Sequence, residues 1–167
     1  MKLNLSVYIP TDFLLESKRD KYLDSNVHID RAGRENGIRR LMSINLLKRL
    51  ESSVVSFRIT LERVLRLINK TIETVNAYEK GNGKIINAQE IVETDFDGDD
   101  RNGSFFGNNT KKMDIDLGDM DYFTWREKLS EDSEILELLS SMIRDITPEN
   151  DSKLQTLVDL IDNKIKN

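Results

Sequence analysis

Residues 47–75 read LKRLESSVVSFRITLERVLRLINKTIETV, and this stretch decides the fold. Its apolar residues recur in steps of three and four, which is the spacing of one face of an α-helix. They are Leu47, Leu50, Val54, Phe57, Leu61, Val64, Ile68, Ile72 and Val75. Leu41 and Ile44 extend this face towards the N-terminus, and Gly81 and Gly83 favour a helix end. We therefore predict a helix over residues 34–79.

A helix of this length does not fit inside a compact domain of this size. At about 1.5 Å of rise per residue, roughly 40 helical residues would span about 60 Å. No proline between residues 31 and 80 marks where such a helix would stop. We therefore expect a kink or a break, or a helix that protrudes from the domain.

The composition restricts the fold class and the chemistry. The chain has 167 residues, of which 38% are hydrophobic and 33% charged, and these values suit one domain with its own core. Two prolines and eight glycines are few for an all-β protein. The absence of cysteine excludes disulfides and thiolate sites, and the one histidine, His28, excludes any site that needs two imidazoles. No long apolar run or signal peptide is present, so we expect a cytoplasmic protein without a membrane partner.

The flanking segments complete a mainly α-helical prediction. Residues 3–9 alternate apolar and polar side chains, which predicts a short N-terminal strand that Pro10 ends. Thr11 is a candidate N-cap for a short helix over residues 12–22. Residues 81–121 are rich in glycine, asparagine and aspartate and predict a long acidic loop, in which residues 84–92 could form a short strand or helix.

Two further helices are predicted over residues 122–167. Asp121 is a candidate N-cap for the first, and Thr147-Pro148 separates it from the second. The apolar residues of the first are Trp125, Leu129, Ile135, Leu136, Leu139, Met142, Ile143 and Ile146, and those of the second are Leu154, Leu157, Val158, Ile161 and Ile165. The whole chain, residues 1–167, is thus predicted to be one helical module, a bundle with one or two long helices.

Acidic residues in the loop suggest a calcium site, but their spacing argues against one. An EF-hand loop that began at Asp95 would need glycine at its sixth position and glutamate at its twelfth. Those positions hold Asp100 and Phe106. A solvated acidic loop is the favoured interpretation, and Asp114, Asp116, Asp119 and Asp121 are interpreted likewise as solvated or capping residues. We predict neither a metal site nor a catalytic residue, and we interpret His28 as a packing or surface residue.

The charge is distributed unevenly along the chain. The net charge is −5, but residues 31–80 hold eleven basic and five acidic side chains, whereas residues 81–167 hold ten basic and twenty acidic ones. On one continuous helix, four cations would lie roughly opposite the apolar face, with one more beside them. The candidate nucleic-acid contacts are Lys48, Arg49, Arg63, Arg66 and Lys70. The alternatives are an ordinary solvated helix face or a face paired with the acidic C-terminal third.

Two stretches of the sequence resemble a known family. Residues 38–61 read IRRLMSINLLKRLESSVVSFRITL, and residues 151–157 read DSKLQTL after a helix with Trp125 and Leu129. Both are similar to bacterial superfamily II helicases of the Swi/Snf-like type, in which such helices lie between the two RecA-like ATPase lobes. The resemblance covers roughly residues 8–78 and 120–166 and leaves the acidic loop unmatched.

The resemblance implies a non-catalytic helical insertion domain of an ATP-dependent DNA helicase or translocase. The chain has no Walker A lysine, DEAH box or arginine finger, so ATP and magnesium would bind elsewhere in the parent protein. The implied partners are the RecA-like lobes of the same parent chain, with the second lobe expected directly after Asn167, and DNA. A helical protein–protein interaction module without nucleic-acid binding remains the alternative.

Overall fold

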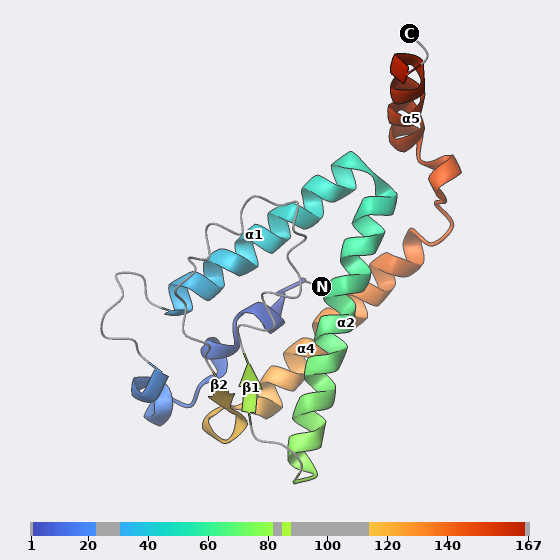
Figure 1. The fold of residues 1–167 in the computed structure, drawn as a ribbon. Coiled ribbons are helices and arrows are strands. Elements are labelled where there is room, and N and C mark those ends of the chain that lie inside the picture. Colours follow the sequence, from blue (N-terminus) through green and yellow to red (C-terminus); the bar gives the residue numbers. More distant parts are fainter. Residues whose placement is uncertain (1, 23–30, 82–84, 88–113, 166–167) are drawn as a thin grey trace.

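The computed structural model describes residues 2–22, 31–81, 85–87 and 114–165, and these residues are mainly helical (Figure 1). Short 3-10 helices η1 (Ser6–Tyr8), η2 (Pro10–Phe13) and η3 (Glu16–Tyr22) come first. The long helices are α1 (Arg31–Ser52), α2 (Val54–Glu79) and α4 (Tyr122–Met142). A two-stranded ribbon, β1 (Ile85–Asn87) and β2 (Asp114–Asp116), is followed by the 3-10 helix η5 (Leu117–Asp119). The last elements are η6 (Pro148–Asn150) and α5 (Ser152–Ile165).

The predicted long helix breaks at Ser53, so α1 and α2 form a hairpin (Figure 1). Ser53 has extended backbone angles, and its hydroxyl oxygen accepts a hydrogen bond of 3.3 Å from the Ser56 N–H. It is therefore the N-cap of α2. At the other end, Gly81 has a φ of +80°, the left-handed conformation that commonly follows a helix. Of the three expected alternatives, a kink, a break or a protruding helix, the break is present, and the predicted helix end is confirmed.

The break also changes which face of the first helix is buried. On α2, the buried apolar residues Phe57, Leu61, Val64, Ile68 and Val75 are those that the spacing predicts. On α1, Ile38, Met42 and Leu46 are buried instead, whereas Leu47 and Leu50 are 62% and 43% exposed. The prediction of one continuous apolar face is therefore wrong for α1. Because Ser53 is extended, the residues before and after it do not lie on one continuous helix, and the spacing of three and four across the break does not place them on one face.

The N-terminal segment is not the predicted strand. Residues 5–11 are buried, and their backbone follows η1 and η2. The left-handed Leu5, with a φ of 54°, starts η1. The Asp132 carboxylate accepts the Asn4 and Ser6 N–H groups, each at 2.7 Å, and these contacts replace the strand partner that the segment lacks. The helix predicted over residues 12–22 is present as the 3-10 helices η2 and η3, separated by residues 14 and 15, of which Leu14 pairs with Met120 in an isolated antiparallel bridge. Thr11 lies inside η2, so the prediction that it is an N-cap is wrong.

The described ends of the predicted acidic loop are ordered and partly buried. Strands β1 and β2 pair in an antiparallel register that aligns the buried Ile86 with the buried Ile115. The loop prediction is therefore wrong for residues 114–119, which form β2 and η5. Of the short strand or helix predicted within residues 84–92, the strand is present as β1. Asp119 is also not solvated, since it is buried and accepts hydrogen bonds from Lys21 and Tyr22. Residues 95–100 and His28 lie outside the described residues.

Helix α4 packs along α2 and carries much of the core (Figure 1). Asp121 accepts the Thr124 N–H at 3.1 Å, so the predicted N-cap is confirmed. Trp125, Leu129 and Leu136 are fully buried, but Met142, which the spacing also assigns to the apolar face, is exposed at the end of the helix. The predicted separation into two helices is confirmed, but its position differs: α4 ends at Met142, Pro148 starts η6, and α5 begins at Ser152. Beyond this connection α5 extends away from the bundle (Figure 1).

No helix in the described part of the chain is long and apolar enough to cross a membrane.

Candidate functional site

The five candidate cations lie on two helices rather than on one. Lys48 and Arg49 are in the last turns of α1, and Arg63, Arg66 and Lys70 follow the break on α2. Lys48, Arg66 and Lys70 are exposed, whereas Arg49 and Arg63 are half-buried. The Arg49 guanidinium donates a hydrogen bond of 3.3 Å to the Ser56 hydroxyl, across the break. The hairpin therefore divides the cationic stripe that one straight helix would present.

Arg66 and Lys70 remain together on an exposed face of α2. They are four residues apart, so they lie one turn apart on the same side of the helix. Glu62 and Glu73, both exposed, flank them along the same helix. This sequence of charges suits two phosphate contacts, and it also suits a solvated helix face with intrahelical pairing.

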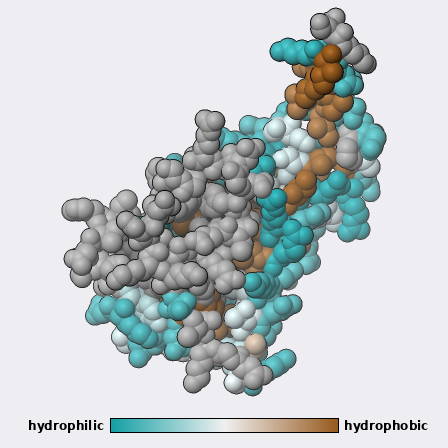
Figure 2. Space-filling view, in the orientation of Figure 1, coloured by the Kyte–Doolittle hydropathy of each residue, from teal (hydrophilic) through white to brown (hydrophobic). Residues whose placement is uncertain are grey.

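Helix α5 has more exposed large apolar side chains than any other described helix. None of its residues is buried. Its exposed apolar side chains, with exposed fractions between 42% and 77%, are Leu157, Val158, Leu160, Ile161 and Ile165. Four of them have the spacing of one helix face, namely Leu157, Val158, Ile161 and Ile165. Figure 2 shows an apolar band that runs along α5 towards the bundle. We call this surface the α5 face. It has the composition of a helix that packs against another surface.

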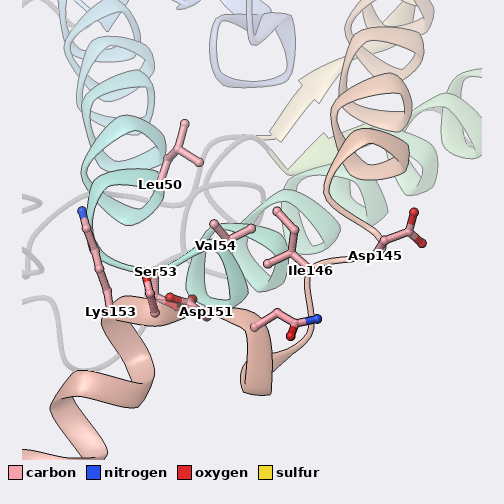
Figure 3. Close-up of a pocket in the computed structure, with 9 residues that line it drawn as sticks. Leu50, Ser53, Val54, Asp145, Ile146, Asp151 and Lys153 are labelled. Atoms are coloured by element: carbon pink, nitrogen blue, oxygen red, sulfur yellow. Dashed lines mark hydrogen bonds between the residues drawn. The ribbon is translucent and has the colours of Figure 1, made fainter.

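A pocket of about 330 Å³ lies where α5 joins the hairpin (Figure 3). Its walls come from the end of α1, the start of α2, the connection from α4 to α5, and the first residues of α5. The residues that line it are Leu50, Ser53, Val54, Asp145, Ile146, Asn150, Asp151, Ser152 and Lys153. Because these segments are distant in sequence, the pocket exists only while α5 is held against the hairpin.

Asp151 is the central polar residue at the junction of α5 with the hairpin, which we call the corner. It is only 5% exposed, and its carboxylate accepts the Ser53 hydroxyl at 2.6 Å and the Leu154 N–H at 3.2 Å. The hydrogen bond from Ser53, together with those from backbone N–H groups, lowers the pKa of Asp151 below its ordinary value. Lys153 donates to the Glu51 carbonyl, and Arg58 donates to the Ile146 carbonyl at 3.2 Å. The corner is therefore a network of charge-assisted hydrogen bonds.

Within the described ranges, no three histidine, aspartate or glutamate side chains gather as a metal site would require. Compared with known proteins, the chain matches no family model, no curated protein and no solved structure. The helicase resemblance therefore stays a prediction.

The corner and the α5 face differ in how well the sequence could reveal them. The spacing of residues 154–165 predicts an amphipathic helix but not that its apolar side would be exposed. Asp151 precedes Leu154 by three residues, which is the signal for an N-cap, and sequence reasoning did not use it. No sequence signal links Asp151 to Ser53.

Proposed function

We propose that this chain is a non-catalytic helical module of an ATP-dependent DNA helicase or translocase in the cytoplasm. In this proposal the α5 face packs against a RecA-like lobe of the same parent enzyme. The exposure of the α5 face is the observation that carries the proposal, and the helicase-like stretch over residues 38–61 supplies the identity of the partner.

The energetics favour a partner for α5. A helix of 14 residues is marginally stable by itself in water, and its stability comes mainly from packing of an apolar face. Full burial of one leucine, isoleucine or valine side chain contributes about 1.5–3 kcal/mol. Five such side chains on the α5 face remain largely exposed, so docking would bury apolar area that the bundle leaves in water.

In this proposal the bundle transmits movement between a RecA-like lobe and the DNA. Helices α2 and α4 pack along each other, and α5 extends from their end (Figure 1). A lobe bound to α5 would transmit its movement to the bundle, and the bundle would pass it to the DNA track or hold the enzyme in one arrangement. ATP and magnesium would act in the lobes, and the module would contribute binding and orientation.

The gene sequence and the parent enzyme test the proposal. A phosphate-binding lysine loop and an acidic box upstream, with a second RecA-like lobe downstream, are the expected findings. In such an enzyme, Leu157→Ser with Ile161→Ser should lower DNA-stimulated ATP hydrolysis, while the exposed Asp162→Asn serves as the control. ATP hydrolysis by the purified chain above a mock preparation would contradict a non-catalytic role.

DNA contact is a second candidate function, favoured by the exposed pair Arg66 and Lys70. Phosphate contacts by these side chains would give affinity that falls steeply with salt and varies little with sequence. The alternative of a protein–protein interaction module without nucleic-acid binding is favoured by the same α5 face. A flanking gene sequence without ATPase motifs, together with no DNA binding at low salt, would select that alternative.

A further inference from the structure

We propose that Asp151 is a conformational latch that sets the direction in which α5 leaves the bundle. By latch we mean the set of hydrogen bonds that the Asp151 carboxylate accepts from the starts of α2 and α5. When these bonds are lost, α5 changes direction about residues 147–150 while the bundle stays folded. The inference concerns the chain itself and goes beyond the proposed docking on a RecA-like lobe.

One carboxylate joins two helices at this point. Oδ2 of Asp151 accepts the Ser53 hydroxyl at 2.6 Å and the Val55 N–H at 3.4 Å, both at the start of α2. Oδ1 accepts the Leu154 N–H at 3.2 Å, in the first turn of α5. An anion stabilises the N-terminal end of a helix, and here a buried one lies at two such ends. An ordinary N-cap serves one helix, whereas Asp151 also fixes α5 to α2.

Packing does little to fix the direction of α5. None of its residues is buried, and its contacts with other elements are concentrated on the neighbouring η6. Within the described residues, hydrogen bonds tie the start of the α5 segment to the hairpin through Asp151 and Lys153. The rest of α5 extends beyond the corner (Figure 1). Among the described residues, the contacts at the start of α5 therefore determine where the α5 face points.

The connection before α5 is held at its start. Arg58 on α2 donates to the carbonyl oxygens of Arg144 and Ile146, at 3.5 and 3.2 Å. The connection is thus tied to α2 by Arg58 near its beginning and by Asp151 at its end (Figure 3 shows the second tie). If the second tie is released, residues 147–150 become the segment about which α5 turns, and the corner pocket opens with it.

Pulsed electron paramagnetic resonance tests this latch directly, because the chain has no native cysteine that would take a label. One label pair, at Glu62→Cys and Asp162→Cys, joins α2 to α5. A second pair, at Glu62→Cys and Glu134→Cys, joins α2 to α4 and reports the bundle. With Asp151 intact, we expect a narrow distance distribution for both pairs. Asp151→Ala should broaden and shift the α2–α5 distribution and leave the α2–α4 distribution unchanged.

Two further variants separate a latch from a simple helix cap. Ser53→Ala removes the shorter of the two hydrogen bonds from the start of α2, that of 2.6 Å, and leaves Asp151 as the cap of α5, so it should also broaden the α2–α5 distribution. Asp151→Asn retains a good capping side chain and loses the charge, and Asp159→Asn makes the same change at an exposed position of α5 as the control.

The outcomes are decisive in both directions. Broadening with Asp151→Ala and with Ser53→Ala, but not with Asp159→Asn, supports the latch. An unchanged α2–α5 distribution in Asp151→Ala, or broadening in Asp151→Ala without any in Ser53→Ala, overturns it. If Asp151→Ala does not fold, Ser53→Ala and Asp151→Asn carry the test, and unchanged distributions in both overturn the proposal.

Discussion

The Asp132 carboxylate accepts the backbone N–H of Ser6 at 2.7 Å, although 126 positions separate the two residues. A second bond of 2.7 Å comes from the Asn4 N–H, and the indole of Trp125 donates to the Ser6 carbonyl at 3.0 Å. Asp132 and Trp125 are both fully buried on α4. The start of the chain is therefore part of the core, held by polar contacts with α4 as well as by its apolar side chains.

Asp132→Ala should strongly destabilise the fold. The substitution leaves two N–H groups in or near the core without their acceptor, and each such loss costs about 1–3 kcal/mol. We expect a decrease of roughly 2–6 kcal/mol in the free energy of unfolding. Urea denaturation followed by the fluorescence of Trp125, the one tryptophan of the chain, measures it. Glu134→Ala, at an exposed position of the same helix, is the control, and an equally small change in both would contradict the prediction.

The sequence predicts the parts of this fold that depend on local periodicity. The buried face of α2, the N-cap at Asp121 and the separation of the last two helices are confirmed, although α4 ends at Met142, before Thr147-Pro148. A helix that packs one side against a neighbour must repeat apolar residues at helical spacing, and that repeat is visible without a structure. The same reasoning is wrong for α1. Leu47 and Leu50 keep the helical spacing of the residues after Ser53, although the helix breaks there, and both side chains are exposed.

Contacts between distant residues explain most of what sequence reasoning missed. Residues 3–9 alternate like a strand, but the fold of this segment depends on Asp132, which lies on another element. Asp119 looks like one of many loop carboxylates, yet it is buried between Lys21 and Tyr22. The link from Asp151 to Ser53 joins residues 98 positions apart. A pattern within one short window contains no information about such pairs.

Leu157→Ser combined with Ile161→Ser should leave the stability of the bundle nearly unchanged. Both side chains are about half exposed, and substitutions at exposed positions usually change the free energy of unfolding by about 0.5 kcal/mol or less. Leu136→Ala, within the core, should cost about 2–5 kcal/mol. Urea denaturation of the three proteins gives the comparison. A loss in the α5 variant as large as that of Leu136→Ala would mean that the α5 face is packed in the free chain.

Acid should destabilise the protein partly through Asp119. Two hydrogen bonds lower the pKa of Asp119 below its ordinary value of 3.8. The bond from Lys21 has the larger effect and the bond from Tyr22 the smaller. A carboxyl whose pKa is lower in the folded state stabilises the fold at pH values above its unfolded pKa. That stability is lost as the pH falls through the folded pKa.

The prediction for Asp119 can be measured with one substitution. Asp119→Asn should lower the free energy of unfolding at about pH 7. Below about pH 5, the free energy of unfolding of this variant should depend less on pH than that of the unmodified protein. Urea denaturation between pH 7 and about pH 3 measures both effects, with Asp114→Asn, an exposed carboxylate on β2, as the control. The assignment fails if the two variants have the same pH dependence as the unmodified protein. Asp151, whose pKa is lowered chiefly by Ser53, should contribute in the same direction.

The last prediction concerns DNA and the hairpin that divides the cations. If the exposed face of α2 contacts phosphates, Arg66→Ala with Lys70→Ala should flatten the dependence of log affinity on log salt by about 0.9 for each contact removed from duplex DNA. Lys48→Ala tests the contribution of α1. If only the α2 face contacts DNA, this substitution should change the slope little. If both helices contact DNA, it should flatten the slope by about 0.9 as well. Titrations of one labelled duplex at several salt concentrations separate these outcomes, with Lys164→Ala on α5 as the control. A slope that does not change with Arg66 and Lys70 removed, or no binding at low salt, would exclude this face as a DNA contact and leave the α5 face as the surface through which the module acts.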